Sequence, residues 1–255
     1  MRNVWIIFRK ELRSYFSSPI AYLLLTMFAV VFGVFFWLIL DQFVRTAMAS
    51  QMRGQMYPMN VNEQVIAPLL HNVAVICNLF LIPLISMRLF AEEKRTGTIE
   101  LLATSPVSDV EVILGKWLAA MALYGCMLLL TALSFIFVFK YGNPDWKPLA
   151  VGYLGLYLQA GALLAIGTFI SSLTRNQIIA GALTFGACIL LWIAGWVEYQ
   201  GTSWARVVSY ICVLTHYESF VKGVIASKDV VYYVSVIFLG LFLTARSMES
   251  LRWRS

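Results

Sequence analysis

The sequence contains little charge. Only 13% of its 255 residues are Asp, Glu, Lys or Arg, whereas 60% are hydrophobic, and the mean hydropathy is +0.79. Soluble domains carry about 25% charged residues, so this apolar content exceeds what a buried core can hold. The chain is therefore predicted to expose apolar surface to lipid. The formal net charge of +6 does not indicate nucleic-acid binding, because Lys and Arg cluster at the ends of apolar runs.

Residues that carry chemistry are also few. The four cysteines have no paired spacing and three lie in apolar runs, which predicts neither a disulfide framework nor a metal site. An intramembrane enzyme using His71 or His216 is a further alternative, but neither histidine has a convincing nucleophile–base set or metal-ligand spacing around it. We expect no catalytic residue and no bound metal.

A phosphate-binding loop is missing as well. The pattern G-x-x-x-x-G-K-[ST] does not occur, and in Gly115-Lys116 the lysine is followed by Trp117 without a glycine-rich stretch before it. Any ATP and Mg²⁺ are therefore expected in a separate partner chain, and no cofactor is expected in this one.

Six apolar runs are long enough, or nearly long enough, to cross a bilayer. A hydrocarbon core of about 30 Å needs roughly 20 apolar residues in a helix. The runs are residues 20–40, 65–87, 117–139, 149–173, 178–197 and 230–245. The last is short and needs extended or snorkelling ends. Because backbone in lipid must pair with itself, we predict one all-α membrane domain over residues 1–255 with six transmembrane helices.

Charge placement predicts the orientation. With six spans and the N-terminus inside, 12 of the 19 Lys and Arg residues fall on the inner side and 7 on the outer side. The positive-inside rule then places both termini in the cytoplasm. The basic start precedes an apolar run too long for a signal peptide, so the first span is expected to be retained.

Two further segments have amphipathic character. Residues 3–16 place apolar side chains near one helical face and charged ones elsewhere, which predicts a helix at the inner interface. The residues of this helix that we assign to the interface are Trp5, Arg9, Lys10 and Glu11. Residues 204–225 carry apolar side chains at three-to-four spacing but are too polar to span, so we expect an interfacial or re-entrant hairpin on the outer side.

A short amphipathic helix is predicted in the polar connection at residues 88–116. Gly97 permits a sharp turn, Thr98 can cap the helix, and Pro106 ends it. Tied to a span on each side, such a helix can dock on a cytoplasmic partner and pass motion to the membrane; an ordinary solvated loop is the alternative. The residues assigned to docking are Glu92, Glu93, Gly97, Thr98, Glu100, Leu101 and Leu102.

The second run contains polar residues, which are costly in lipid and often functional. Asn78 follows His71 by seven residues, so the two are predicted to share a helix face. With Asn72, they could line a substrate path. The alternative is hydrogen bonding between helices, and Gln159 has the same two readings.

Several stretches resemble a known family. FAEEKRTGTIELL at residues 90–102, continued by SPVS at 105–108, resembles the signature of ABC-2-type transporter permeases. RKELRSYFSSP at residues 9–19, HYESF at 216–220 and the segment from Arg246 to Trp253 are similar to the gliding-motility-type permease subfamily. The resemblance covers essentially the whole chain.

The resemblance implies a fold and an assembly. Two six-span subunits pair, as a homodimer, mainly through their first and fifth spans, and each docks an ABC ATPase subunit. Residues 98–104 would be the coupling helix, residues 5–16 the helix bordering the ATPase, and residues 204–225 the outward hairpin at the exit. An auxiliary extracytoplasmic membrane-anchored protein often accompanies this subfamily.

The implied function is that of the permease subunit of an exporter in the bacterial cytoplasmic membrane. The expected substrate is amphiphilic or polymeric. The alternative is mechanotransmission, in which ATP hydrolysis drives an extracytoplasmic partner and nothing crosses the bilayer.

Overall fold

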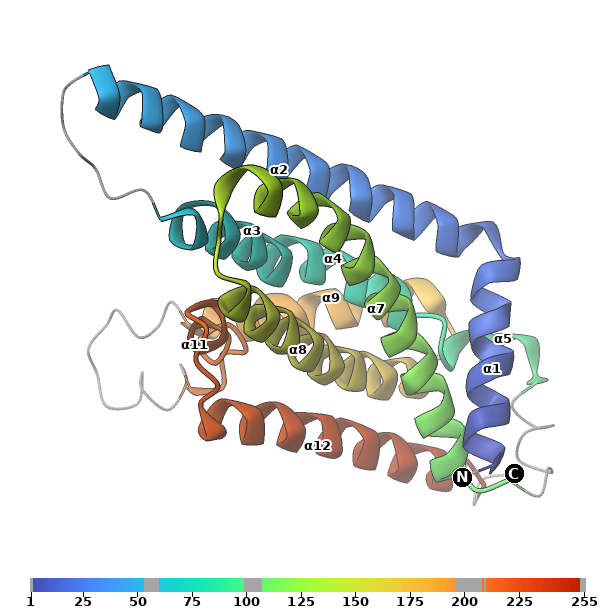
Figure 1. Cartoon of the computed structure of the whole chain (residues 1–255). Helices are drawn as coiled ribbons and strands as arrows, with labels where there is room; N and C mark the ends of the chain where they lie inside the picture. The colour runs from blue at the N-terminus through green and yellow to red at the C-terminus, as the bar shows by residue number, and fades with distance from the viewer. Residues whose placement is uncertain (1, 53–59, 99–106, 196–207, 209, 253–255) are drawn as a thin grey trace.

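A computed structural model describes residues 2–52, 60–98, 107–195, 208 and 210–252. These residues form helices and connecting turns, without a β-strand among them (Figure 1). The first half of the chain contains α1 (Arg2–Ser17), α2 (Pro19–Met52), η1 (Asn62–Ile66), α3 (Ala67–Asn72), η2 (Val73–Cys77), α4 (Asn78–Ser86) and α5 (Ala91–Thr96). The second half contains α7 (Asp109–Gly142), α8 (Trp146–Leu173), α9 (Gln177–Ile193), α11 (Glu218–Val221) and α12 (Ser227–Arg252).

Five of the predicted spans are confirmed as helices long and apolar enough to cross a membrane. They are Pro19–Met52, Asn62–Thr96, Asp109–Gly142, Trp146–Leu173 and Ser227–Ser250. The fifth predicted run, residues 178–197, corresponds to α9, which has 17 residues and is therefore shorter than the other five. Residues 3–16, predicted as an interface helix, lie within the helix α1, and its place at the inner membrane interface stays a prediction.

Three helices are longer than the apolar runs within them. α2 continues to Met52 instead of ending near residue 40, because no Gly or Pro follows until residue 54 and polar side chains alone do not stop a helix. α7 begins at Asp109, where Ser108 and Glu111 form a reciprocal capping box. α12 extends beyond residues 230–245 at both ends, as the short sixth run required.

The second span is irregular. Two wide, π-helical turns, η1 and η2, interrupt it, and each has five residues. The first wide turn contains Gln64, whose carbonyl the ring of Pro68 would meet in a regular α-helix. Wide turns of this kind often occur at functional sites.

α8 lies at the centre of the bundle and packs against α12, α7, α4, α9 and α11. Small residues allow these close approaches: a Cβ added at Gly240 of α12 would lie 2.8 Å from the backbone carbon of Ala165 in α8. Ala165 therefore serves close packing inside the bundle. Gly186, in contrast, has nothing within 4 Å of such a Cβ.

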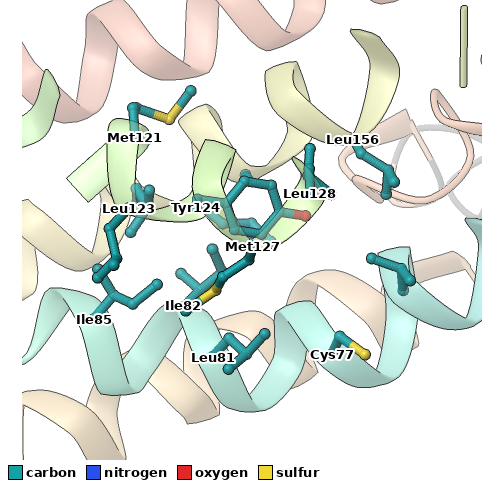
Figure 2. Packing of buried hydrophobic residues seen from close by; sticks show 14 of the residues in the cluster. Cys77, Leu81, Ile82, Ile85, Met121, Leu123, Tyr124, Met127, Leu128 and Leu156 are labelled. Carbon is teal, nitrogen blue, oxygen red and sulfur yellow. The ribbon is translucent and has the colours of Figure 1, made fainter. Parts of the chain in front are cut away.

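The apolar core continues between the second span and α7. In Figure 2, Ile82 and Ile85 of α4 point towards α7, where Leu123 and Met127 face them. All four side chains are fully buried. This packing fixes the second span against the centre of the bundle.

The outer segment is only partly described. Trp204 lies outside the described residues, so the predicted hairpin over residues 204–225 is not tested as a whole. The described remainder contains α11, a helix of four residues, and packs Tyr217 and Phe220 onto α8. The two termini lie together at the opposite end of the bundle from α11 (Figure 1).

The Gly240–Ala165 approach gives a test of the packing. Gly240→Ala is expected to lower the free energy of unfolding by about 1–3 kcal/mol, because the new methyl group would press on rigid backbone. The control Gly186→Ala should change it by less than about 1 kcal/mol. Melting temperatures of the detergent-purified variants measure both, and equal effects would show that the α8–α12 contact is looser than described.

Candidate functional site

α5 is the short helix that follows the second span directly. Glu92 and Glu93 lie in its first turn and Lys94 and Arg95 in its last, which complements the helix dipole. Gly97 ends the helix with φ of +75°, a left-handed conformation that glycine adopts without strain. The sharp turn predicted at Gly97 is therefore confirmed.

A buried lysine ties α5 to α1 and α7. Lys116 of α7 is 2% exposed, and its Nζ lies 2.8 Å from Glu93 Oε1 and 3.0 Å from Glu11 Oε1. The same ammonium group sits 5.5 Å from the centre of the Phe90 ring. One cation thus holds carboxylates from two other segments, and a buried charge of this kind is stable only with such partners.

One face of α1 packs on the start of α7. Asn3 donates a hydrogen bond to Glu111 at 3.1 Å, and Gly115 leaves room for the Ile7 side chain to approach the α7 backbone. Asn3, Ile7 and Glu11 are spaced by four and therefore form one stripe along α1. The Trp5 side chain points elsewhere, is 64% exposed and stacks on Phe8.

The turn before α5 is fixed to the end of α8. The backbone N–H groups of Phe90 and Ala91 both donate to Ser171 Oγ, each at 3.1 Å. The Lys94 ammonium group donates to the carbonyl oxygen of Ser172. α5 is therefore held by three membrane-domain helices at once: α1, α7 and α8.

Arg88 adds a second ion pair to this corner. Its Nε lies 3.1 Å from Glu92 Oε2, and its guanidinium carbon lies 6.0 Å from the centre of the Tyr15 ring. Burial first, and then the negative charge of Glu11, raise the pKa of Tyr15, so its hydroxyl stays neutral. We call Glu11, Arg88, Glu92, Glu93 and Lys116 the cytoplasmic corner, after the side of the membrane that the sequence predicts for it.

The predicted docking residues divide into two groups. Glu93 turns inward to Lys116, and its side chain is only 15% exposed, whereas Gly97 and Thr98 are exposed. Glu100, Leu101 and Leu102 lie outside the described residues, so their docking role stays a prediction. Arg9 and Lys10 are exposed on α1.

Lys116 was missed as a site residue. From the sequence, Lys116 counts only as one of the positive charges on the predicted inner side, beside an apolar run. The available signal was a lysine embedded between apolar residues on a helix, since such a lysine needs an acidic partner. Which acids supply that partner depends on tertiary contacts between segments about 20 and 100 residues away.

The predicted path residues are not brought together. His71 is exposed, whereas Asn78 is 1% exposed and accepts a 2.7 Å hydrogen bond from the Tyr124 hydroxyl. The prediction of a shared face was wrong, because the wide turn η2 lies between the two residues and alters the helical register. Asn78 takes part in interhelical hydrogen bonding, while Asn72 is half-buried and its path role is untested.

The outer end contains a second polar cluster. His216 Nδ1 lies 2.8 Å from Asp229 Oδ1, and His216 Nε2 lies 2.9 Å from the Tyr210 carbonyl oxygen. Ser219 donates to Asp229 and to the backbone carbonyl oxygen of His216, not to the imidazole ring, so these residues form no nucleophile–base pair. Among the described residues no group of three or more His, Cys, Asp and Glu side chains is arranged to hold a metal. The cluster fastens the outer segment to α12.

Comparison with known proteins gives one match. A family model described as "ABC-2 family transporter protein" matches residues 5–245. No curated protein matches the chain. The match begins within α1 and ends within α12, and it includes the cytoplasmic corner.

Removing the central cation tests the corner. Lys116→Met leaves two carboxylates facing each other in a largely buried place, and it is expected to lower the free energy of unfolding by about 3–5 kcal/mol. Adding Glu11→Gln and Glu93→Gln to that variant should restore part of the loss. The exposed pair of Arg45 and Asp41 supplies the control, since Arg45→Met should leave the melting temperature nearly unchanged. If Lys116→Met melts like the control, the corner is not held by this cation.

Proposed function

The chain belongs to the ABC-2 family of transporter proteins and is a membrane permease subunit of an ABC transporter, and from that membership we propose that it couples ATP hydrolysis in a separate subunit to export. ATP and Mg²⁺ would bind to that ATPase partner. The substrate proposed is amphiphilic or polymeric. The gliding-motility-type subfamily remains part of the proposal, and so does an auxiliary extracytoplasmic protein.

The observation that carries this proposal is the cytoplasmic corner. α5 contacts α1 and α7 through Lys116, and α8 through Ser171. A force applied to α5 therefore cannot be absorbed by a loose loop, because hydrogen bonds and ion pairs join α5 to the helices that cross the membrane. This is the mechanical requirement for a coupling element.

We propose that the ATPase docks on the residues at and after the end of α5. Glu92, Arg95 and Thr98 have the accessibility such a contact needs, and residues 99–104 continue from them in the sequence. The exposed face of α1, with Trp5, would border the same partner. Glu11 and Glu93 would act indirectly, by holding α1 and α5 in position.

We also propose six crossings, with α9 as the fifth. At 1.5 Å per residue its 17 residues extend about 25 Å, slightly less than a bilayer core. Both termini lie at the same end of the bundle, which requires an even number of crossings (Figure 1). The 12-to-7 distribution of Lys and Arg supports a cytoplasmic position for that end, in the bacterial inner membrane.

The small cavity inside the described bundle does not support a substrate path through one chain. The cavity inside the described bundle, between the second span, α8 and α9, has a volume of about 20 Å³, enough for about one water molecule. Export would therefore take place between two copies of the chain. If that seam is closed as well, the alternative of mechanotransmission to an extracytoplasmic partner applies.

The proposed seam uses α2 and α9. Val30, Val34 and Trp37 form an exposed apolar stripe on α2, and Ile179, Leu183 and Leu190 form another on α9. Stripes of this kind suit either lipid or a second copy. The family resemblance of the sequence favours the second copy, as a homodimer with two-fold symmetry.

Cross-linking tests the seam. In a chain whose native cysteines are replaced by alanine, Val34→Cys should yield covalent dimers with a short thiol-reactive cross-linker in native membranes. Phe238→Cys, exposed on α12 at the other side of the bundle, is the control and should yield mostly monomer. Dimers through Phe238→Cys alone would move the interface to α12.

Co-purification tests the docking surface. Leu101→Asp is expected to reduce recovery of the ATPase with the detergent-solubilised chain at least about tenfold, equivalent to roughly 1.4 kcal/mol, because a charge would enter an apolar contact. Ile225→Asp makes a matched change at an exposed position on the outer segment. Undiminished recovery with Leu101→Asp would contradict the docking assignment; loss with both variants would point to misfolding.

A further inference from the structure

Two buried amide groups in the bundle core each have an atom without a partner among the described residues. They are Asn78 of α4, which is 1% exposed, and Gln159 of α8, which is 2% exposed. The atoms concerned are Asn78 Nδ2, a donor, and Gln159 Oε1, an acceptor. Leaving such atoms unpaired in an apolar interior is unfavourable, so each requires a partner.

The other ends of both amides are fixed. Gln159 Nε2 donates to the Ala74 carbonyl at 3.1 Å, and this bond determines the orientation of its amide, since two oxygens would repel. Asn78 Oδ1 accepts from the Tyr124 hydroxyl. A hydroxyl can also accept, so a reversed Asn78 would bond equally well to Tyr124 and still present one polar atom to its surroundings.

Both side chains line the same small cavity. Its volume is about 20 Å³, and the remaining walls are mostly apolar, from the second span, α8, α9 and the outer segment. That volume holds about one water molecule, for which roughly 10–15 Å³ is the minimum. A water molecule donates and accepts, so it suits Gln159 Oε1 and either orientation of Asn78.

We propose that this cavity is a binding site for a single water molecule that links Asn78 to Gln159. The site lies beside η2, whose Ala74 carbonyl is already bonded to Gln159. The water would join the irregular second span to the central helix α8 without a direct side-chain bond between them. The site follows from the two amides and the cavity alone, so its failure would leave the proposed transport function standing.

A double-mutant cycle on the full chain tests the link. Asn78→Leu and Gln159→Leu are each expected to lower the melting temperature, and the double variant should lose about 2–4 °C less than the sum of the two. The control cycle pairs Asn78→Leu with Thr131→Val, a buried change outside the cavity lining, and should be additive. Additive losses in both cycles would overturn the proposal.

A direct observation separates water from other causes of coupling. A structure of the unaltered chain that resolves waters should show a density peak within hydrogen-bonding distance of both amides. The peak should be absent in Gln159→Leu. Coupling without a peak would mean that the two side chains contact each other directly, and the water site would then be wrong.

Discussion

A single buried ammonium group holds together the end of the molecule that contains α1 and α5. The charged Lys116 side chain would be unstable in neutral surroundings, because a charge removed from water needs opposite charge close by. Glu11 and Glu93 supply that charge from α1 and α5. The amphipathic start of the chain, the helix after the second span and the first turns of α7 therefore form one unit, and the position of α5 depends on it.

The centre of the bundle depends on a different constraint, the close approach of helices in lipid. There is no hydrophobic driving force between helices there, so small residues that let backbones meet have a large effect. α8 has this role: Ala165 meets Gly240, and a Cβ at Gly155 would come within 2.6 Å of Phe220. The helix that receives hydrogen bonds from the turn before α5 thus also packs closely on α12 and on the outer segment, so it is placed to pass displacement to both.

Much of the fold could be predicted from the sequence, because lipid imposes a length and composition on each span that is visible locally. α1, five spans and the turn at Gly97 follow from such local rules. The wide turns of the second span could not be predicted, since several backbone geometries fit one apolar run. Because of these turns, the expectation that His71 and Asn78 share a helix face was wrong. The partners of Lys116 were also out of reach, because they come from segments far apart in sequence and meet only through tertiary packing.

The irregular second span is the place at which the movement required by the proposed function would occur. Because α5 is bound to three helices, a displacement of the cytoplasmic corner would move α5 together with these contacts. The strain would then pass to the second span, which leads directly into α5. In that span η2 is a wide turn, and such turns often occur at functional sites. Asn78 and Gln159 lie beside η2, and each is fixed by one hydrogen bond to a neighbouring element. A firmly held end joined to an irregular helix is the arrangement that the proposed coupling requires, whether a substrate or an extracytoplasmic partner would receive the motion.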